Sequence, residues 1–165
     1  MFMDKSINSK ELHSIGIIWN MGNEFANEII SKIAQLSELL NVRKYDLKDR
    51  YDDFVLDCYK GDNEAFLEGY IYEKIKNMKS ATNNKVVLFL VKINNPTYKL
   101  NAENGVYQCA EIKAIKYKIR EEFSTKIEGY FFDNLIHMTD NMEEYERINN
   151  VIGNYDEYIE TILNL

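Results

Sequence analysis

The sequence predicts one α+β domain in which helices cover a small β-sheet. The chain has 165 residues, which suits a single domain and leaves no room for two independent cores. It contains one proline and seven glycines, and this scarcity favours long regular elements over a loop-rich sandwich. Short β-branched runs also alternate with stretches of helical periodicity, so both strands and helices are expected.

The first strand and the first helix follow from a change of periodicity near residue 20. Ser14–Trp19 is a β-branched run followed by Asn20 and Gly22, which predicts a strand and then a turn. From Glu24 onward apolar residues recur at helical spacing, with Asn23 as the expected N-cap.

One further strand and two helices are predicted before residue 84. Leu40–Leu47 has the composition of a strand, and Asp52–Tyr59 that of a short helix. A second helix is expected to be capped by Asn63 and to run through Met78.

The clearest strand covers Lys85–Ile93. Its centre, Val86–Val91, is apolar at every position, so both faces should be covered, as in a central strand. This apolar run of six residues is far shorter than the ~20 needed to cross a bilayer. The polar stretch Pro96–Gly105 is expected to be an irregular loop.

The last third of the chain predicts one strand among three helices. A helix is expected at Val106–Phe123, and the aromatic and β-branched segment Tyr130–Ile136 is expected to be the last strand. Asp140 or Asn141 would then cap the next helix. Two helices close the chain, at Met142–Val151 and Asp156–Leu163.

This order contains two βαβ-like halves and fits a ferredoxin-like split βαβ fold, with an antiparallel sheet of about four strands covered by helices. A doubly wound sheet is the alternative. No repeat or low-complexity linker divides the chain, so residues 1–165 are expected to form one domain, with residues 1–12 as a flexible N-terminal segment.

Charge and cysteine content limit the expected partners and compartment. The net charge of −7 repels phosphate backbones, which argues against nucleic-acid binding. Cys58 and Cys109 are far apart and form no CxxC pair, so they are expected to be buried thiols in a reducing compartment. Residues 1–12 contain no apolar stretch that would serve as a signal peptide. A cytoplasmic protein without membrane association is therefore expected.

The candidate functional centre is the segment from Asn134 to Asp140. His137 is predicted to end a buried strand, with Asn134 before it and Thr139 and Asp140 after it. An imidazole held by such groups could act as a base or as a phosphoryl-accepting nucleophile. The alternative is structural, in which His137 closes a strand and the polar residues cap the next helix.

A row of cations on one predicted helix face is the second candidate. Lys113, Lys116 and Arg120 lie at i, i+3 and i+7 and could hold a phosphate. The alternative is a solvated face balanced by neighbouring glutamates.

Aromatic and basic residues outside this helix supply weaker candidates. Tyr59 and Lys74 fall on the helices between the second and third strands and could equally be ordinary surface. Trp19 could stack on a base or lie in the core. The sequence contains no phosphate loop, dinucleotide-binding turn, nucleophile elbow or zinc pattern.

The segment Asn134-Leu-Ile-His137-Met-Thr139-Asp140 resembles the Asn-x-x-His-Gly-Ser-Asp motif of the nucleoside diphosphate kinase family. Upstream, Ile-Arg120-Glu-Glu-Phe is similar to that family's Ile-Arg-Gly-Asp-Phe. The resemblance implies a ferredoxin-like core with His137 as the phosphoryl acceptor, forming a phosphohistidine. It also implies a nucleotide contact for Asn134, phosphate contacts for Arg120 and Tyr59, and Thr139 in place of the motif serine.

The sequence departs from the family pattern at several places. The loop between Arg120 and His137 is longer by a few residues, and the family's second phosphate arginine has no equivalent between Ile93 and Lys113. Trp19 ends the first strand where the family places an essential lysine, and Met138 replaces the motif glycine. Ile148 stands at the spacing of the glutamate that orients the family's histidine, with Glu146 two residues before it. Lys74 and Lys116 would then replace the missing cations.

The predicted function is a nucleotide-dependent phosphoryl or nucleotidyl transferase, a kinase-like enzyme in which Thr139 and Asp140 orient His137. A nucleoside triphosphate would bring Mg²⁺ bridging its phosphates, and the family resemblance implies a homo-oligomer. One alternative is a catalytically inactive nucleotide- or protein-binding module of the same fold. Another is a small acidic viral or regulatory interaction protein. The sequence does not specify the acceptor or the preferred base.

Overall fold

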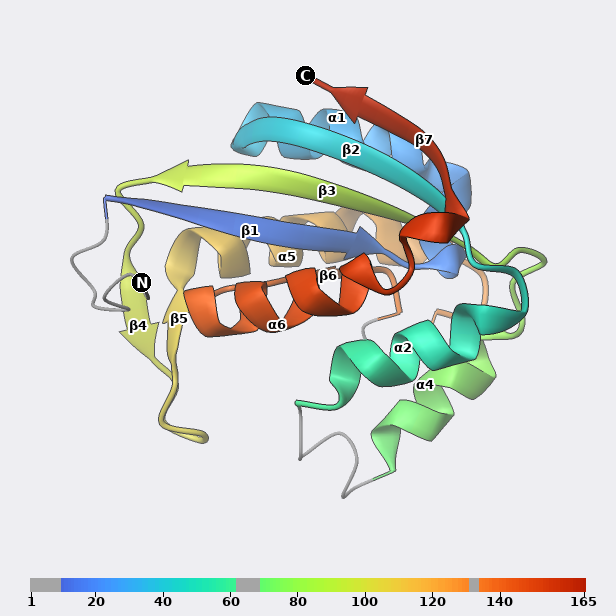
Figure 1. Ribbon diagram of the computed structural model, residues 1–165. Helices are drawn as coiled ribbons and strands as arrows, with labels where there is room; N and C mark the ends of the chain where they lie inside the picture. Colours follow the sequence, from blue (N-terminus) through green and yellow to red (C-terminus); the bar gives the residue numbers. More distant parts are fainter. Residues whose placement is uncertain (1–9, 62–68, 131–133) are drawn as a thin grey trace.

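The computed structural model describes residues 10–61, 69–130 and 134–165. Its main sheet has five strands in the order β6-β1-β3-β2-β7, and every pair of neighbours is antiparallel (Figure 1). These strands are β1 Glu11–Ile18, β2 Glu38–Asp46, β3 Lys85–Asn94, β6 Ile136–Met138 and β7 Ile159–Asn164. The helices are α1 Ala26–Leu36, α2 Tyr51–Tyr59, α4 Tyr70–Met78, α5 Ala110–Phe123 and α6 Met142–Gly153. A separate hairpin consists of β4 Tyr98–Leu100 and β5 Tyr107–Cys109.

Two connections of the sheet run between parallel strands that are separated by one other strand. The chain passes from β1 through α1 to β2, and β3 lies between the two strands. It then passes from β3 through α5 to β6, with β1 between them. The β3 strand is thus central, as its continuous apolar run predicts.

Helices pack on both faces of the sheet, and each face has its own core. Figure 1 shows α1 and α5 behind the sheet and α6 in front of it. The core on the α1 and α5 side includes Ile33, Phe89 and Ile119. The core on the other side is aromatic and includes Trp19 and Phe54. Because neighbouring residues of a strand point to opposite faces, each central strand contributes to both cores.

The region between β3 and α5 differs from the predicted loop. Residues 98–109 form the β4–β5 hairpin, and α5 begins at Ala110 rather than at Val106. Two long-range backbone bonds fix this start, because Cys109 N donates to Asp140 O at 2.8 Å and Ala110 N to Thr97 O at 2.7 Å. Such tertiary contacts are not visible in a local polar composition.

The predicted closing helix at Asp156–Leu163 is wrong. A short 3₁₀ turn at Asp156–Tyr158 leads into β7, which pairs with β2 and makes the sheet five-stranded rather than four-stranded. The apolar spacing of Ile159, Ile162 and Leu163 suits a helix, but β2 has an edge that needs a partner. Strand pairing with that edge prevails over the local pattern.

Two of the predicted helix caps can be compared with the structure. Asn141 caps α6 as expected, since its side chain accepts from Glu144 N at 2.8 Å. The predicted cap at Asn23 is wrong, because a 3₁₀ turn at Asn20–Phe25 precedes α1 and Phe25 occupies the N-cap without a side-chain bond. The proposed cap at Asn63 lies outside the described residues.

The bounds of β1 and β6 also differ from those expected from the sequence. The last of the predicted strands, Tyr130–Ile136, is displaced, because β6 covers Ile136–Met138, and residues 131–133 lie outside the described residues. At the other end, β1 already begins at Glu11 and includes His13. No described helix is long and apolar enough to cross a membrane.

A close approach at Gly16 gives a test of the core. A β-carbon at this position would lie 1.9 Å from the ring of Phe89, the residue paired with Gly16 across β1 and β3. We expect Gly16→Ala to lower the free energy of unfolding in urea by about 1–3 kcal/mol through overpacking. Gly153→Ala, where nothing lies within 4 Å, is the control and should change it little. Recovery of stability in Gly16→Ala with Phe89→Leu would confirm the cause, and a fully stable Gly16→Ala would contradict it.

Candidate functional site

His137 is placed by the alternation of the three-residue strand β6. Ile136 and Met138 are buried in the core beside α1 and α5, so His137 points to the opposite face, where α6 lies. Its Nε2 is 2.8 Å from Oε1 of Glu144, and both side chains are about one-fifth exposed (20% and 21%). His137 thus lies at the rim of the protein, half-buried and held by a carboxylate.

Glu144 reaches His137 because of the way α6 begins. Asn141 is the N-cap, so Glu144 lies in the first turn, and its Oε2 accepts from Asp140 N at 3.3 Å. An N-cap residue followed three positions later by a glutamate that bends back over the helix start resembles a capping box. The two carboxylate oxygens therefore join the helix start to the imidazole.

Glu144 is held in its ionised form by this arrangement. Burial by itself raises the pKa of Glu144, but the hydrogen bond and charge of His137 outweigh it. The Asp140 backbone N–H and the Lys116 ammonium act in the same direction, and together they lower the pKa to about 2. A carboxylate that stays ionised fixes a proton on Nε2 of His137. No described residue forms a hydrogen bond with the other ring nitrogen, Nδ1.

Aromatic rings line the interior side of His137. The ring of Tyr59 meets the imidazole edge-to-face at a centroid distance of 5.9 Å. Trp19 is fully buried and stacks on Tyr59 at 6.1 Å, so it lies in the core rather than on an open stacking surface. Lys74 Nζ donates to the Tyr59 hydroxyl at 2.9 Å and also lies over its ring. Of the predicted phosphate-binding residues, Tyr59 therefore contacts His137, and Lys74 contacts Tyr59.

Two of the three cations predicted on α5, Lys116 and Arg120, contact the edge strand β6. The carbonyls of Ile136 and Met138 point away from β1, because β6 pairs with β1 through the alternate residues. Arg120 donates to Ile136 O at 3.1 Å, and Lys116 to Met138 O at 3.4 Å. Two side chains thus satisfy the outward carbonyls of a strand that has no neighbouring strand on that side among the described residues.

Lys116 also forms an ion pair with Asp140 at 3.2 Å, and both side chains are largely buried. Burial raises the pKa of Asp140, the Lys116 ammonium opposes that rise, and the Glu144 carboxylate adds to it. Asp140 and Glu144 therefore form a small acidic pair between the Lys116 ammonium and the His137 imidazole.

The remaining predicted site residues lie in other surroundings. Thr139 is fully buried, and its hydroxyl accepts from Ile15 N at 3.0 Å. Asn134 is also buried and donates to Asn77 Oδ1 at 2.6 Å, with no partner for its own Oδ1 among the described residues. Lys113 is exposed on α5 and faces the β4–β5 hairpin.

Glu144 is the functional candidate that sequence reasoning did not find. The spacing inherited from the family motif pointed to Ile148 and Glu146. The available signal was local, since Asn141 and Glu144 have the spacing of a helix start that directs the glutamate backward. Within residues 10–61, 69–130 and 134–165, no group of three histidine, cysteine or acidic side chains is arranged to hold a metal ion.

No protein-family model matches the chain, and no curated protein matches it. Among solved structures, it is similar to a nucleoside-diphosphate kinase from Borrelia burgdorferi, determined as a transition state mimic with bound vanadate and ADP. The identity is 14%, the match covers 92% of each chain, and the TM-score is 0.49. A likeness at this level assigns no activity, so function has to be inferred from the site itself.

The His137–Glu144 pair predicts a pH-dependent contribution to stability. The pKa of Glu144 falls from 4.5 to about 2 on folding, so its contribution is complete above pH 4.5 and is lost as the pH falls toward 2. We expect Glu144→Gln to lower the free energy of unfolding by about 1–3 kcal/mol at pH 7. The difference from wild type should be smaller at pH 3, as measured by urea unfolding at both pH values.

Glu143→Gln is the matched control, because Glu143 lies in the same helical turn but is exposed. It should have little effect at either pH. A loss of stability in Glu144→Gln that is equal at pH 7 and pH 3 would contradict the proposed ionic pairing.

The Lys116–Asp140 pair predicts a loss of stability that is specific to the pair. Lys116→Met leaves the Asp140 carboxylate buried without its cation and should lower the free energy of unfolding by about 3 kcal/mol. Adding Asp140→Asn should restore much of that loss in urea unfolding. Lys113→Met, at an exposed position of the same helix, is the control and should be nearly neutral. Additive losses in the double variant would contradict the pairing.

Proposed function

We propose that this protein is a nucleotide-dependent phosphoryl transferase in which His137 accepts the phosphoryl group. The observation that supports the proposal is the 2.8 Å contact between His137 Nε2 and Glu144. It holds a proton on Nε2 and leaves the lone pair of Nδ1 available as the nucleophile.

In this reaction, Nδ1 of His137 forms a bond to the γ-phosphorus of a nucleoside triphosphate. The bond from that phosphorus to the bridging oxygen breaks, and its electron pair leaves with the nucleoside diphosphate. The positive charge that develops on the imidazole is balanced by the Glu144 carboxylate. An acceptor oxygen then takes the phosphoryl group from Nδ1 and regenerates the histidine.

Lys74 and Tyr59 are the proposed phosphate contacts, because Tyr59 packs against the imidazole and Lys74 contacts Tyr59. The Lys74 ammonium, bonded to the Tyr59 hydroxyl, supplies a positive charge for phosphate oxygens. Mg²⁺ would be held mainly by the phosphates, which suits a region whose described residues form no three-ligand cluster.

In this proposal, most of the other predicted site residues hold strand β6 in place and do not contact the phosphate. Lys116 and Arg120 position His137 by holding the carbonyls on either side of it. Thr139 anchors the end of β6 to β1, and Asn134 ties the strand to α4 through Asn77. We also propose that the order β6-β1-β3-β2 is a ferredoxin-like split βαβ core to which β7 has been added. Cytoplasmic location and homo-oligomeric assembly belong to the same proposal.

A catalytically inactive nucleotide- or protein-binding module is the second candidate. It is favoured by Trp19, which is fully buried against Tyr59 at the position where the resembled family has a lysine. A buried indole at the end of β1 cannot contribute a charge to a phosphate, so the site would have one cation fewer for catalysis.

Labelling with radioactive nucleotide tests the phosphoryl transfer. Incubation with Mg²⁺ and ATP or GTP labelled at the γ-phosphate should give a covalent label that is stable to alkali and labile to acid. We expect His137→Ala to abolish this label and Glu144→Gln to reduce it at least about tenfold, since the orienting carboxylate is lost. His13→Ala, in β1, is the control and should label like wild type. Label from the α-phosphate would instead indicate nucleotidyl transfer.

Nucleotide binding without turnover distinguishes the second candidate. A ligand that binds only the folded state raises the melting temperature, and the rise grows with the logarithm of the ratio of ligand concentration to Kd once the site is near saturation. A rise in melting temperature without any covalent label supports the inactive module. The absence of both effects in the wild-type protein would contradict the transferase and the nucleotide-binding module, and it would favour a protein-binding module or a small acidic interaction protein.

A further inference from the structure

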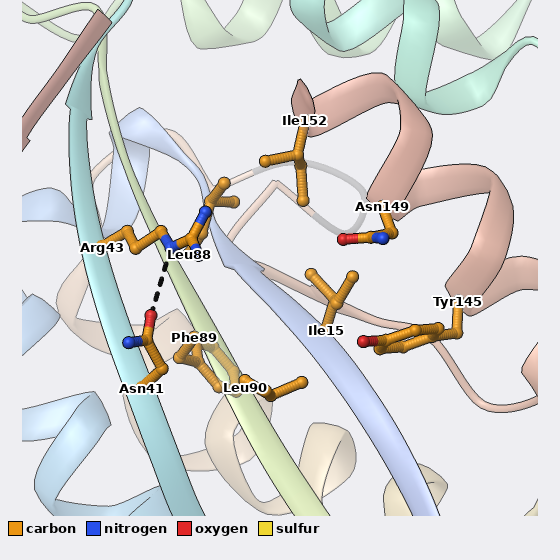
Figure 2. A pocket seen from close by; sticks show the side chains of 9 residues that line it. All are labelled: Ile15, Asn41, Arg43, Leu88, Phe89, Leu90, Tyr145, Asn149 and Ile152. Carbon is orange, nitrogen blue, oxygen red and sulfur yellow. Dashed lines mark hydrogen bonds between the residues drawn. The ribbon is translucent and has the colours of Figure 1, made fainter. Parts of the chain in front are cut away.

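A second pocket lies between α6 and strands β1, β3 and β2 (Figure 2). Its volume is about 230 Å³, below the roughly 300 Å³ at which pockets for drug-sized ligands begin. It is separate from the His137 site, because consecutive residues of a helix point about 100° apart. Glu144 is directed to His137, whereas Tyr145 lines the pocket on the other flank of α6.

Arg43 places a positive charge at the strand side of this pocket. It is half-buried on β2, and its Nε donates to Asn41 Oδ1 at 3.2 Å, which orients the guanidinium. Its charge also opposes the rise in the pKa of Tyr45 that burial causes. No carboxylate among the described residues forms an ion pair with Arg43. A partly desolvated guanidinium of this kind is stabilised by an anion.

The helix side of the pocket offers uncharged polar groups. Tyr145 and Asn149 lie four residues apart on α6, hence on one face. Figure 2 shows the Tyr145 hydroxyl and the Asn149 carboxamide extending from α6 toward the strands. These groups can donate hydrogen bonds to an anion from the side opposite to Arg43.

Between these polar groups the floor of the pocket is apolar. Ile15 and Leu90 are paired across β1 and β3, with Leu88 two residues before Leu90 and Ile152 above them on α6. An apolar body placed there would be removed from water at roughly 25 cal/mol per Å². The pocket therefore combines one cation and neutral donors with an apolar floor.

We propose that this pocket binds a small organic monocarboxylate with a compact apolar body. The carboxylate accepts two hydrogen bonds from the Arg43 guanidinium, and the body packs on Leu88, Leu90 and Ile152. A single guanidinium matches a single negative charge. A phosphate monoester dianion would need a second cation, and among the described residues that line the pocket Arg43 is the only cationic side chain.

The test is a titration of ¹⁵N-labelled full-length protein at constant ionic strength, with amide chemical shifts as the readout. The probe is 3-phenylpropionate, and its comparison ligands are neutral 3-phenylpropionamide and acetate. We expect saturable shifts at Ile15, Leu88, Tyr145 and Asn149, with a Kd that is roughly millimolar for a ligand of this size. The amide and acetate should each bind at least about tenfold more weakly, since the amide lacks the carboxylate and acetate lacks the apolar body.

Matched variants separate the carboxylate contact from general effects. Arg43→Gln should weaken 3-phenylpropionate about tenfold and leave the affinity for the neutral amide unchanged. Lys44→Gln is the control, because Lys44 is the next residue on β2 and points to the opposite face. Tyr145→Phe removes a single hydroxyl and should weaken the acid severalfold while keeping the fold. His137→Ala should bind the acid like wild type. The binding test for this pocket is therefore independent of the test for phosphoryl transfer.

Three results would overturn the proposal. The first is the absence of saturable shifts with 3-phenylpropionate at tens of millimolar. The second is equal affinity for the acid and the neutral amide, or an affinity that Arg43→Gln and Tyr145→Phe both leave unchanged. The third is a set of shifts centred on His137 and Tyr59 rather than on the pocket, which would place the anion at the other site.

Discussion

The fastening of β6 to the edge of the sheet is the interaction on which the candidate site depends. A strand of three residues gains little from its own pairing, and no strand in the described part of the chain pairs with its outer carbonyls. Arg120 and Lys116 satisfy those carbonyls from α5, and Thr139 bonds to β1 at the strand's end. These contacts fix the alternation that buries Ile136 and Met138 and turns His137 toward α6.

The start of α6 completes the site from the other side. Asn141 caps the helix, and Glu144 both accepts from the backbone before the cap and holds His137. The same helix contributes Tyr145, Asn149 and Ile152 to the second pocket. A shift or rotation of α6 would therefore alter the imidazole contact and the pocket together, because residues on one rigid helix move as a unit.

The sequence predicted the sheet best where local pattern and tertiary environment agree. The continuous apolar run of β3 requires cover on both faces, and the structure places this strand at the centre. The pattern failed at β7, where three apolar residues suit a helix as well as a strand. Only the unpaired edge of β2, which is distant in sequence, decides between the two forms.

The candidate site also combines features that local sequence predicts with features that depend on tertiary contacts. His137 could be singled out from its polar neighbours and from the family resemblance, and the cap at Asn141 could be predicted from local chemistry. The partner of His137 was missed, because a spacing transferred from the family pointed past Glu144 to Ile148. The cation row on α5 was visible in the sequence, but its use depends on where β6 ends. That boundary cannot be fixed by propensity alone for so short a strand.

The distribution of charge around His137 decides how a phosphate could bind to so acidic a protein. Lys116 is balanced by Asp140, and Arg120 is directed to a backbone carbonyl, so neither adds a freely directed charge at the imidazole. Lys74 differs, because its ammonium donates to the hydroxyl of Tyr59 and lies over the ring of Tyr59, which itself packs edge-to-face on His137. In the proposed phosphoryl transfer, Lys116 and Arg120 therefore position the strand, and Lys74 is the side chain whose charge is assigned to the phosphate oxygens.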